Sequence, residues 1–390
     1  MPKITGIDAH PILDSRGEWT IEVGLTIDRH LRVVASAPQG KSTGAHEASI
    51  VSPKKAILNA LLIEKKLRGM DPSRQNEIDH TIIALDGTAT KKRLGANTIL
   101  AISIATARAA AHLRRVPLWK HLRALSGAKK NSSLPRLFVN VINGGLHAGN
   151  NLPFQEYLVM PRARTMARAV REVMLIYKTL EDLLVREKGA SAKNKGDEGG
   201  FAPHFKDPLE PFSYIMRAAK IAGVSSMINV GLDAAATNVT LAKEKLVALY
   251  RSMAMRFPLA YLEDPFGEEQ FTAFASLKSV VGKKTLIAGD DLTTTNLARM
   301  HIARRMGSVN AIIIKPNQIG TISEALEAVR EARTYGWTVI ASHRSGETND
   351  DFIADFAVGI GADGIKLGAP ARGERIAKYN RLLSIAKELP

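Results

Sequence analysis

The chain has 390 residues, of which 45% are hydrophobic and 24% charged, and this length predicts two to three domains with a sizeable core. Because cysteine is absent, a disulfide scaffold, a thiolate nucleophile and a cysteine-held zinc or iron–sulfur site are excluded. The net charge of +16 excludes an acidic disordered chain. Basic residues are scattered without an RNA-binding signature, so we interpret the charge as favouring solubility and small anions, with no requirement for nucleic acid.

The chain shows no sign of a membrane span or a secretory signal. The long uncharged stretch 137–155 is interrupted by asparagines and glycines, which a membrane span does not tolerate. The first eight residues lack the apolar core of a secretory signal. We therefore expect a cytoplasmic protein with no membrane partner.

The first third of the chain predicts a small α+β domain. Residues 19–27 alternate between apolar and polar side chains, which predicts a strand. A Gly- and Ser-rich segment follows at 38–44, and the alanine-rich run 97–112 predicts a buried helix. Residues 126–133 are small and polar, as is typical of a linker. We therefore place a boundary between residues 1–130 and 131–390.

Beyond the linker, short apolar runs alternate with stretches of helical length, such as 320–335, which is the pattern of repeated βα units. The runs are 227–232, 259–262, 285–289, 311–314, 338–342 and 362–365. A parallel barrel closes such units most simply. A polar or charged residue directly follows each run: Asp233, Glu263, Asp290, Lys315, His343 and Lys366. Because the carboxyl ends of barrel strands meet at one mouth, these side chains are predicted to share one pocket.

The six side chains together indicate metal-assisted proton abstraction beside a carboxylate. Any one of them could be a helix cap or a loop charge, but buried carboxylates and lysines without partners cost several kcal/mol each. A metal ion would offset that cost. Asp233, Glu263 and Asp290 offer only hard oxygen ligands, which favour magnesium or manganese over zinc. We expect nearby positive charge to lower the pKa of Lys315 and make it a base.

Several short motifs occur in order along nearly the whole chain. In the second part these are Gly196-Asp197-Glu198-Gly199-Gly200, Leu262-Glu263-Asp264-Pro265, Gly289-Asp290-Asp291-Leu292, Lys315-Pro316-Asn317-Gln318 and Ser342-His343-Arg344-Ser345. In the first part they are Asp14-Ser15-Arg16-Gly17, Ser42-Thr43-Gly44 and Leu94-Gly95-Ala96-Asn97. Together these motifs resemble the enolase family, the phosphopyruvate hydratases. The resemblance implies an α/β fold in which a small α+β N-terminal capping domain (1–130), with a mobile Ser42 loop, precedes a catalytic modified TIM-type (β/α)8 barrel (131–390).

The resemblance also implies the reaction, a reversible dehydration of 2-phosphoglycerate to phosphoenolpyruvate in glycolysis and gluconeogenesis. Lys315 would remove the C2 proton, and Glu198 would act as general acid on the C3 hydroxyl, for which we expect a raised pKa. Two Mg²⁺ ions per active site would stabilise the enediolate, a pairing general in this superfamily. The family also implies a homodimer or a higher homo-oligomer.

The resemblance assigns the remaining site residues by motif. Asp233, Glu263 and Asp290 would hold one magnesium, and Ser42 the second. Arg344 and Ser345 would hold the phosphate. The catalytic set is Glu198, Lys315, Glu156, His343 and Lys366, and the substrate-binding set is His147, Gln155, Glu156, Ser342, His343, Arg344, Ser345 and Lys366. For His147 and His343, a purely structural role is the alternative.

Two departures from the family pattern bear on activity, and two other functions compete. Lys41 is bulkier than the family's small loop residue, and the connection between Asp233 and Glu263 is shorter than usual, which affects turnover more than reaction type. One alternative is another acid-sugar dehydratase or racemase of the superfamily. The other is an enolase-like protein whose basic surface binds RNA or anionic lipid, which would show steep salt dependence.

Overall fold

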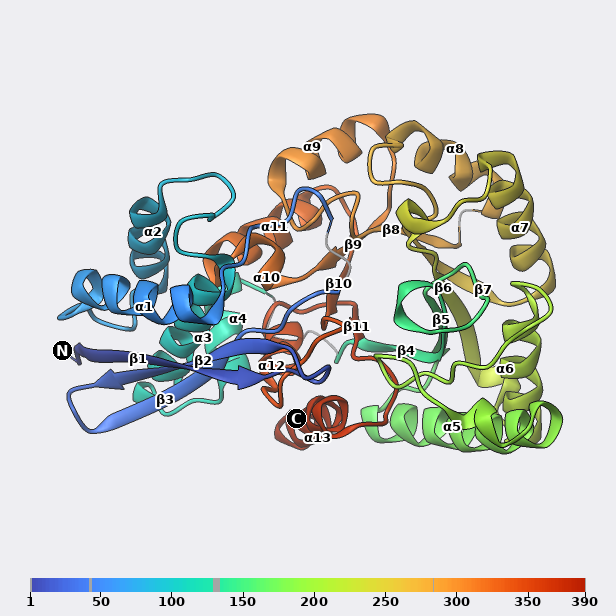
Figure 1. Cartoon of the computed structure of the whole chain (residues 1–390), viewed down its shortest axis with the longest axis horizontal. Helices are drawn as coiled ribbons and strands as arrows, with labels where there is room; N and C mark the ends of the chain where they lie inside the picture. Colours follow the sequence, from blue (N-terminus) through green and yellow to red (C-terminus); the bar gives the residue numbers. More distant parts are fainter. Residues whose placement is uncertain (1, 42–43, 129–133, 283, 390) are drawn as a thin grey trace.

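The computed structural model describes residues 2–41, 44–128, 134–282 and 284–389. Figure 1 shows a smaller part, with a flat sheet, beside a larger part built around a barrel. Ser42 and the predicted boundary at residue 130 lie outside the described residues. None of the helices that the structure describes is both long and apolar enough to span a membrane.

The N-terminal part is a three-stranded antiparallel sheet covered by helices. Its strands lie in the order β1 (Ile4–Leu13), β2 (Trp19–Ile27) and β3 (Leu31–Ser36). The predicted strand at 19–27 is confirmed, and its apolar residues Ile21, Val23, Leu25 and Ile27 are buried, as alternation requires. The helices are α1 (Pro53–Leu67), α2 (Gln75–Asp86), α3 (Ala96–Leu113) and α4 (Leu118–Ser126). The predicted buried helix is α3.

The second part is a closed barrel of eight strands, which confirms the predicted fold class. The strands are β4 (Arg136–Asn143), β5 (Glu156–Pro161), β6 (Ile228–Asp233), β7 (Leu259–Glu263), β8 (Leu286–Gly289), β9 (Ala311–Ile314), β10 (Thr338–Ser342) and β11 (Gly364–Lys366). Each of the six predicted apolar runs overlaps one of these strands, from β6 to β11. Side chains such as Phe138, Tyr261 and Ile313 fill the barrel interior, so it is a packed core rather than a pore.

The six predicted runs, β6 to β11, pair in parallel as expected, and the barrel departs from the regular parallel pattern at β5, for which no run was predicted. β5 runs antiparallel to both of its neighbours, β4 and β6. The connection from β4 to β5 contains only a short 3₁₀ turn (Gly145–His147), and a parallel pairing would need a longer crossover, usually a helix. Because β5 is reversed, its first residue, Glu156, lies at the mouth of the barrel and pairs in register with Asp233, the last residue of β6.

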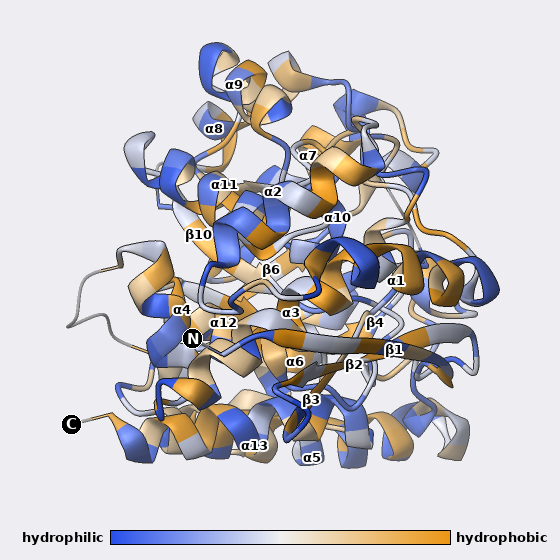
Figure 2. Cartoon of the chain, turned by 90° about the vertical axis from the view of Figure 1, so that its left-hand side faces the viewer, coloured by the Kyte–Doolittle hydropathy of each residue, from blue (hydrophilic) through white to orange (hydrophobic). Residues whose placement is uncertain are grey.

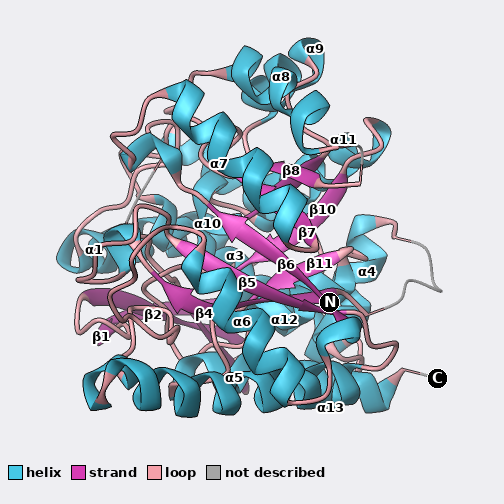
Figure 3. Cartoon of the chain, turned by 90° about the vertical axis from the view of Figure 1, so that its right-hand side faces the viewer, coloured by secondary structure: helices cyan, strands magenta, loops and turns pink. Residues whose placement is uncertain are grey.

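Helices surround the barrel (Figure 3). They are α5 (Met166–Lys188), α6 (Glu210–Ile221), α7 (Lys243–Arg256), α8 (Phe271–Val281), α9 (Leu297–Met306), α10 (Pro316–Ile319), α11 (Ile322–Thr334), α12 (Phe352–Gly359) and α13 (Gly373–Glu388). Further 3₁₀ turns lie at Ala190–Lys193, Ser225–Met227 and Ala236–Asn238. Blue and orange residues mix along α5 and α13 in Figure 2, as expected of helices with one buried face.

Ion pairs and backbone bonds join the two parts. Arg108 of α3 contacts Asp350 at 2.6 Å, and Lys91 contacts Glu324 of α11 at 2.5 Å. The segment after β3 reaches the barrel, where Gln39 and Gly346 each donate a backbone hydrogen bond of 2.9 Å to the other. The N-terminal part is therefore fixed beside the barrel mouth.

Candidate active site

The barrel mouth holds a cavity of about 420 Å³ in which the predicted residues meet. Twelve of them line it: His147, Gln155, Glu156, Glu198, Asp233, Asp290, Lys315, Ser342, His343, Arg344, Ser345 and Lys366. Glu263 lies beneath this lining, fully buried. Three further residues line the cavity that sequence reasoning did not select: Ala235, Asp264 and Asp291. The convergence predicted from the strand ends is therefore present in the structure.

Lys366, the last residue of β11, lies among three carboxylates. Its Nζ donates to Glu263 Oε2 at 2.6 Å, to Asp233 Oδ2 at 3.1 Å and to Glu156 Oε1 at 3.3 Å. Burial lowers the pKa of Lys366, but the carboxylates of Asp233, Glu156 and Glu263 outweigh burial. The net pKa of Lys366 lies well above its ordinary value. Lys366 is therefore a buried ammonium that neutralises part of this acidic group.

Glu263 retains a carboxylate oxygen without a hydrogen-bond partner among the described residues. Tyr261 donates to Oε2 at 2.5 Å, but Oε1 is buried and unsatisfied. Burial, and then the nearby Asp233, raise the pKa of Glu263 to about 8. A buried acceptor with no donor is costly, and a hard cation would satisfy it. The all-oxygen donor set of Asp233, Glu263 and Asp290 therefore fits magnesium.

Lys315 is bound to Asp290, and this contact affects its pKa in the metal-free chain. Its Nζ donates to Asp290 Oδ2, while Gln318 Nε2 donates to Asp290 Oδ1 at 2.9 Å. Burial is the largest single influence and lowers the pKa of Lys315, but Asp290 and Glu263 together outweigh it, and the net direction is upward. The lowered pKa is predicted for a site that holds a dication and stays a prediction, whereas in the metal-free chain the ion pair with Asp290 favours the ammonium form.

Asp264 and Asp291 add acidity that was not predicted. Among the described residues, the carboxylate oxygens of Asp264, Asp290 and Asp291 approach within 4.8 Å of one another, whereas the predicted ligands Asp233 and Glu263 do not join this group. Asp264 accepts the backbone N–H groups of Asp290 (3.1 Å) and Asp291 (2.6 Å). Burial and Asp290 raise the pKa of Asp291 to about 7. The doublets Glu263-Asp264 and Asp290-Asp291 were a visible signal of this acidity.

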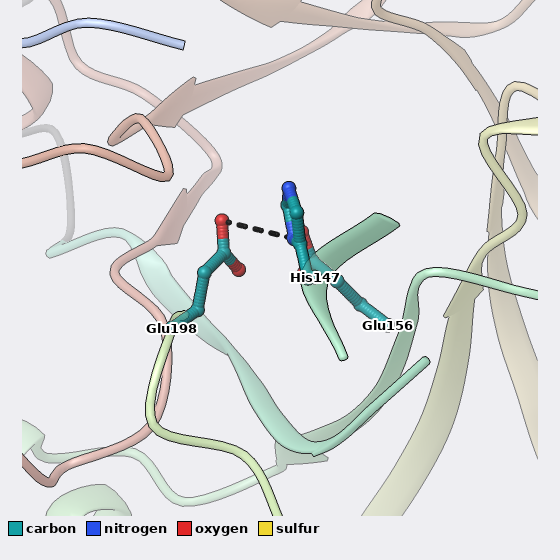
Figure 4. A group of neighbouring side chains, drawn as sticks. All are labelled: His147, Glu156 and Glu198. Carbon is teal, nitrogen blue, oxygen red and sulfur yellow. Dashed lines mark ion pairs between the residues drawn. The ribbon is translucent and has the colours of Figure 1, made fainter. Parts of the chain in front are cut away.

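A second cluster surrounds Glu198 (Figure 4). His343 Nε2 lies 3.1 Å and His147 Nδ1 3.6 Å from Glu198 Oε1, and Asn140 donates to Oε2 at 3.1 Å. Ligand atoms of His147, Glu156 and Glu198 lie within 4.8 Å of one another. The loop can approach this closely because a Cβ on Gly196 would lie only 2.5 Å from the His147 carbonyl oxygen.

The prediction of a raised pKa for Glu198 is wrong. Burial raises the pKa of Glu198, but His343 and His147 outweigh burial. The net pKa of Glu198 lies well below its ordinary value. Burial and the Glu198 carboxylate instead raise the pKa of Glu156 well above its ordinary value. Burial also lowers the pKa of His343 to about 4. In the metal-free site these opposite directions favour protonation of Glu156 over protonation of Glu198.

Arg344 and Ser345 lie on the loop that follows β10 and are held by α13 and by the N-terminal part. Arg375 donates to the carbonyl oxygens of both residues at 2.7 Å. The Lys41 backbone N–H donates to Ser345 Oγ at 2.7 Å. Glu47 forms a two-pronged ion pair with the Arg344 guanidinium, at 2.8 and 3.0 Å. Sequence reasoning missed Glu47, because the two residues lie 297 positions apart.

Comparison with known proteins agrees with this arrangement. Residues 4–122 match the model of the enolase N-terminal domain, and residues 131–240 and 237–390 match that of the enolase C-terminal TIM barrel domain. The chain is 41% identical to Enolase of Methanopyrus kandleri, covering all of this chain and 96% of that protein. It is 40% identical to Enolase B of Dictyostelium discoideum, covering 99% and 95%. It is also 40% identical to Enolase of Methanocaldococcus jannaschii, covering 99% and 96%. The chain therefore belongs to the enolase family, the phosphopyruvate hydratases.

Proposed function

We propose that Lys315 and Glu198 carry the reversible conversion of 2-phosphoglycerate to phosphoenolpyruvate and water in glycolysis and gluconeogenesis. Lys315 removes the C2 proton, and Glu198 protonates the departing C3 hydroxyl. The observation that supports this most is that both side chains line one cavity together with the phosphate-binding candidates Arg344 and Ser345. The reaction needs at least one general acid and one general base that reach the same small substrate.

We propose that Asp233, Glu263 and Asp290 hold one Mg²⁺ and that Ser42 contributes to a second. The unsatisfied Glu263 Oε1 supports this assignment. Bound magnesium would neutralise the acidic group and withdraw electrons from the substrate carboxylate, which acidifies the C2 proton. Because Asp290 is the largest of the influences that raise the pKa of Lys315, with Glu263 after it, Lys315 would become a base when these carboxylates bind a cation instead.

The Glu156 and Glu198 pair supplies the proton for the second half of the reaction. In the free site the pKa of Glu198 is lowered and that of its neighbour Glu156 is raised, so a proton in this cluster favours Glu156. Transfer between them would place the proton on Glu198 when the hydroxyl leaves. His343, at 3.1 Å, orients the Glu198 carboxylate. His147 and Gln155 line the same side of the cavity and contact the substrate.

Arg344 and Ser345 bind the phosphate, beside Ser342 at the end of β10 and His343, which follows it. The guanidinium is the best protein donor for a phosphoryl group. Lys366, which lies opposite among the carboxylates, binds the substrate carboxylate. We further propose a cytoplasmic homodimer or higher homo-oligomer, on the basis of the family alone.

The test is the appearance of phosphoenolpyruvate, followed by ultraviolet absorbance, when purified protein receives 2-phosphoglycerate with and without magnesium. Product formation only with magnesium supports the proposal, and no product under either condition refutes it. Acid sugars without phosphate serve as the control substrates, because turnover of these alone would indicate another member of the superfamily. Salt separates this function from a polyanion-binding role, because binding of RNA or anionic lipid should weaken steeply with added salt, whereas activity at saturating substrate should change only modestly.

A further inference from the structure

The carboxylate of Glu47 is in direct contact with the guanidinium of Arg344 inside the active-site wall. Arg344 Nη1 donates to Oε2 at 2.8 Å and Nη2 donates to Oε1 at 3.0 Å. Both side chains are buried, at 3% and 7% exposure. Glu47 belongs to the N-terminal part and Arg344 to the barrel, so the pair crosses the junction between them. Burial lowers the pKa of Arg344, but Glu47 raises it, and the net pKa lies above the ordinary value of an arginine.

Each partner is also held in place without the other. Glu47 Oε1 accepts the backbone N–H of Gly44 at 3.1 Å and the side-chain amide of Gln318 at 3.4 Å. The backbone of Arg344 donates to Glu347 at 3.0 Å and accepts from Arg375 at 2.7 Å. Positioning of the arginine therefore has several sources, whereas Glu47 brings a full negative charge into contact with its guanidinium.

That charge has a consequence for any anion that binds Arg344. An arriving phosphoryl group must share the guanidinium with Glu47, and two like charges so close together in a buried site repel strongly. If Glu47 is neutralised, the empty site keeps a buried cation with less compensation. A bound phosphate then supplies the negative charge that Glu47 no longer provides, so the affinity of the site for phosphate rises.

We propose that Glu47 sets the affinity of the site for the phosphoryl group, holding it below the value that Arg344 would otherwise give so that product can leave. This inference rests on the proposed function, in which Arg344 holds the phosphate. Glu47 acts through Arg344 and is a positioning and affinity-setting residue rather than a catalytic one.

The test compares the wild-type chain with Glu47→Gln and Glu47→Asp, using inorganic phosphate as the probe and ³¹P NMR line broadening as the measure of Kd. Glu47→Gln removes the charge, and we expect phosphate to bind about tenfold more tightly, equivalent to about 1.4 kcal/mol. Glu47→Asp withdraws the carboxylate by one methylene and should tighten binding by a smaller factor. With substrate, KM and kcat should both fall in Glu47→Gln, because product release slows.

The matched control is Glu324→Gln, which removes one negative charge from another ion pair across the same junction, with Lys91. Lys91, the partner of Glu324, does not line the cavity, whereas Arg344, the partner of Glu47, does. Glu324→Gln should therefore lower the melting temperature but leave phosphate Kd unchanged. The proposal is overturned if either Glu47 variant that folds binds phosphate no more tightly than wild type. Because the NMR experiment needs no turnover, its outcome is separate from whether the wild-type chain dehydrates 2-phosphoglycerate.

Discussion

Replacing Lys366 with methionine tests the electrostatics of the acidic group directly. Methionine keeps most of the side-chain volume but removes the ammonium that contacts Glu263, Asp233 and Glu156. Lys366 is 2% exposed, so water cannot replace the lost charge. Breaking a buried ion pair by removing one partner costs about 3–5 kcal/mol. Since a whole domain is stable by only about 5–15 kcal/mol, we expect a large drop in the melting temperature of the metal-free variant.

The loss should depend on pH with a defined sign. The pKa of Glu263 is already raised to about 8 by burial and Asp233, and removing Lys366 raises it further. A carboxyl group whose pKa is higher in the folded than in the unfolded state stabilises the fold at low pH, and this contribution is lost as pH rises through the folded value. Lys366→Met should therefore be closest to wild type near pH 5 and furthest from it near pH 9.

The assay is thermal unfolding in chelator and again in millimolar magnesium, at each pH. Magnesium binds only the folded site and stabilises it by mass action, and it should recover part of the loss in Lys366→Met. An exposed lysine on α1, replaced as Lys55→Met, controls for the loss of a surface charge. Equal melting temperatures for wild type and Lys366→Met in chelator at pH 8 would refute the argument that this ammonium compensates the buried carboxylates.

Other residues give further expectations. Magnesium binding should release protons and strengthen from pH 6 to 8, because the pKa values of Asp291 (about 7) and Glu263 (about 8) are raised mainly by burial; calorimetry in buffers of different ionisation enthalpy measures this release. Lys315→Ala should abolish exchange of the C2 proton with solvent, followed by NMR in D₂O, yet retain magnesium binding; retained exchange would assign the base elsewhere. His121 is buried without a hydrogen-bond partner among the described residues, and burial lowers its pKa to about 4. Stability should therefore fall as pH drops from 6.5 to 4, by up to about 3 kcal/mol, and melting curves of His121→Leu should lack this loss.

The arrangement of strands and site residues was predictable to the extent that it follows from local pattern. The residues after β6 to β11 meet because parallel strands present the same end to one mouth, and a run of apolar residues followed by Asp233 or Lys366 carries that information. The reversed strand β5 was not predictable in this way. The apolar residues of β5 would form a strand in either direction. Only the short connection before Glu156 indicates that β5 is antiparallel to its neighbours.

The pKa directions of Glu198 and Lys315 in the metal-free chain could not be predicted, for a different reason. Expectations for Glu198 and Lys315 considered which charges share the pocket, but a pKa depends on which group is in contact. His343 and His147 surround Glu198, and Asp290 contacts Lys315. Those contacts depend on side-chain placement at the mouth, to which residues far apart in the sequence contribute.

The site is the joint product of the two parts of the chain, and the charges explain why. The barrel alone supplies the buried carboxylates of the mouth and the two lysines, Lys315 and Lys366, that compensate their charge. This compensation does not depend on bound substrate. The N-terminal part supplies Glu47, which compensates Arg344, and Arg108, which compensates Asp350. Buried charges without partners destabilise a fold, so separation of the two parts is opposed wherever such a pair crosses the junction. If Arg344 binds phosphate as proposed, the contact with Glu47 that joins the two parts also sets the charge on the phosphate-binding residue, which would couple assembly of the fold to substrate affinity.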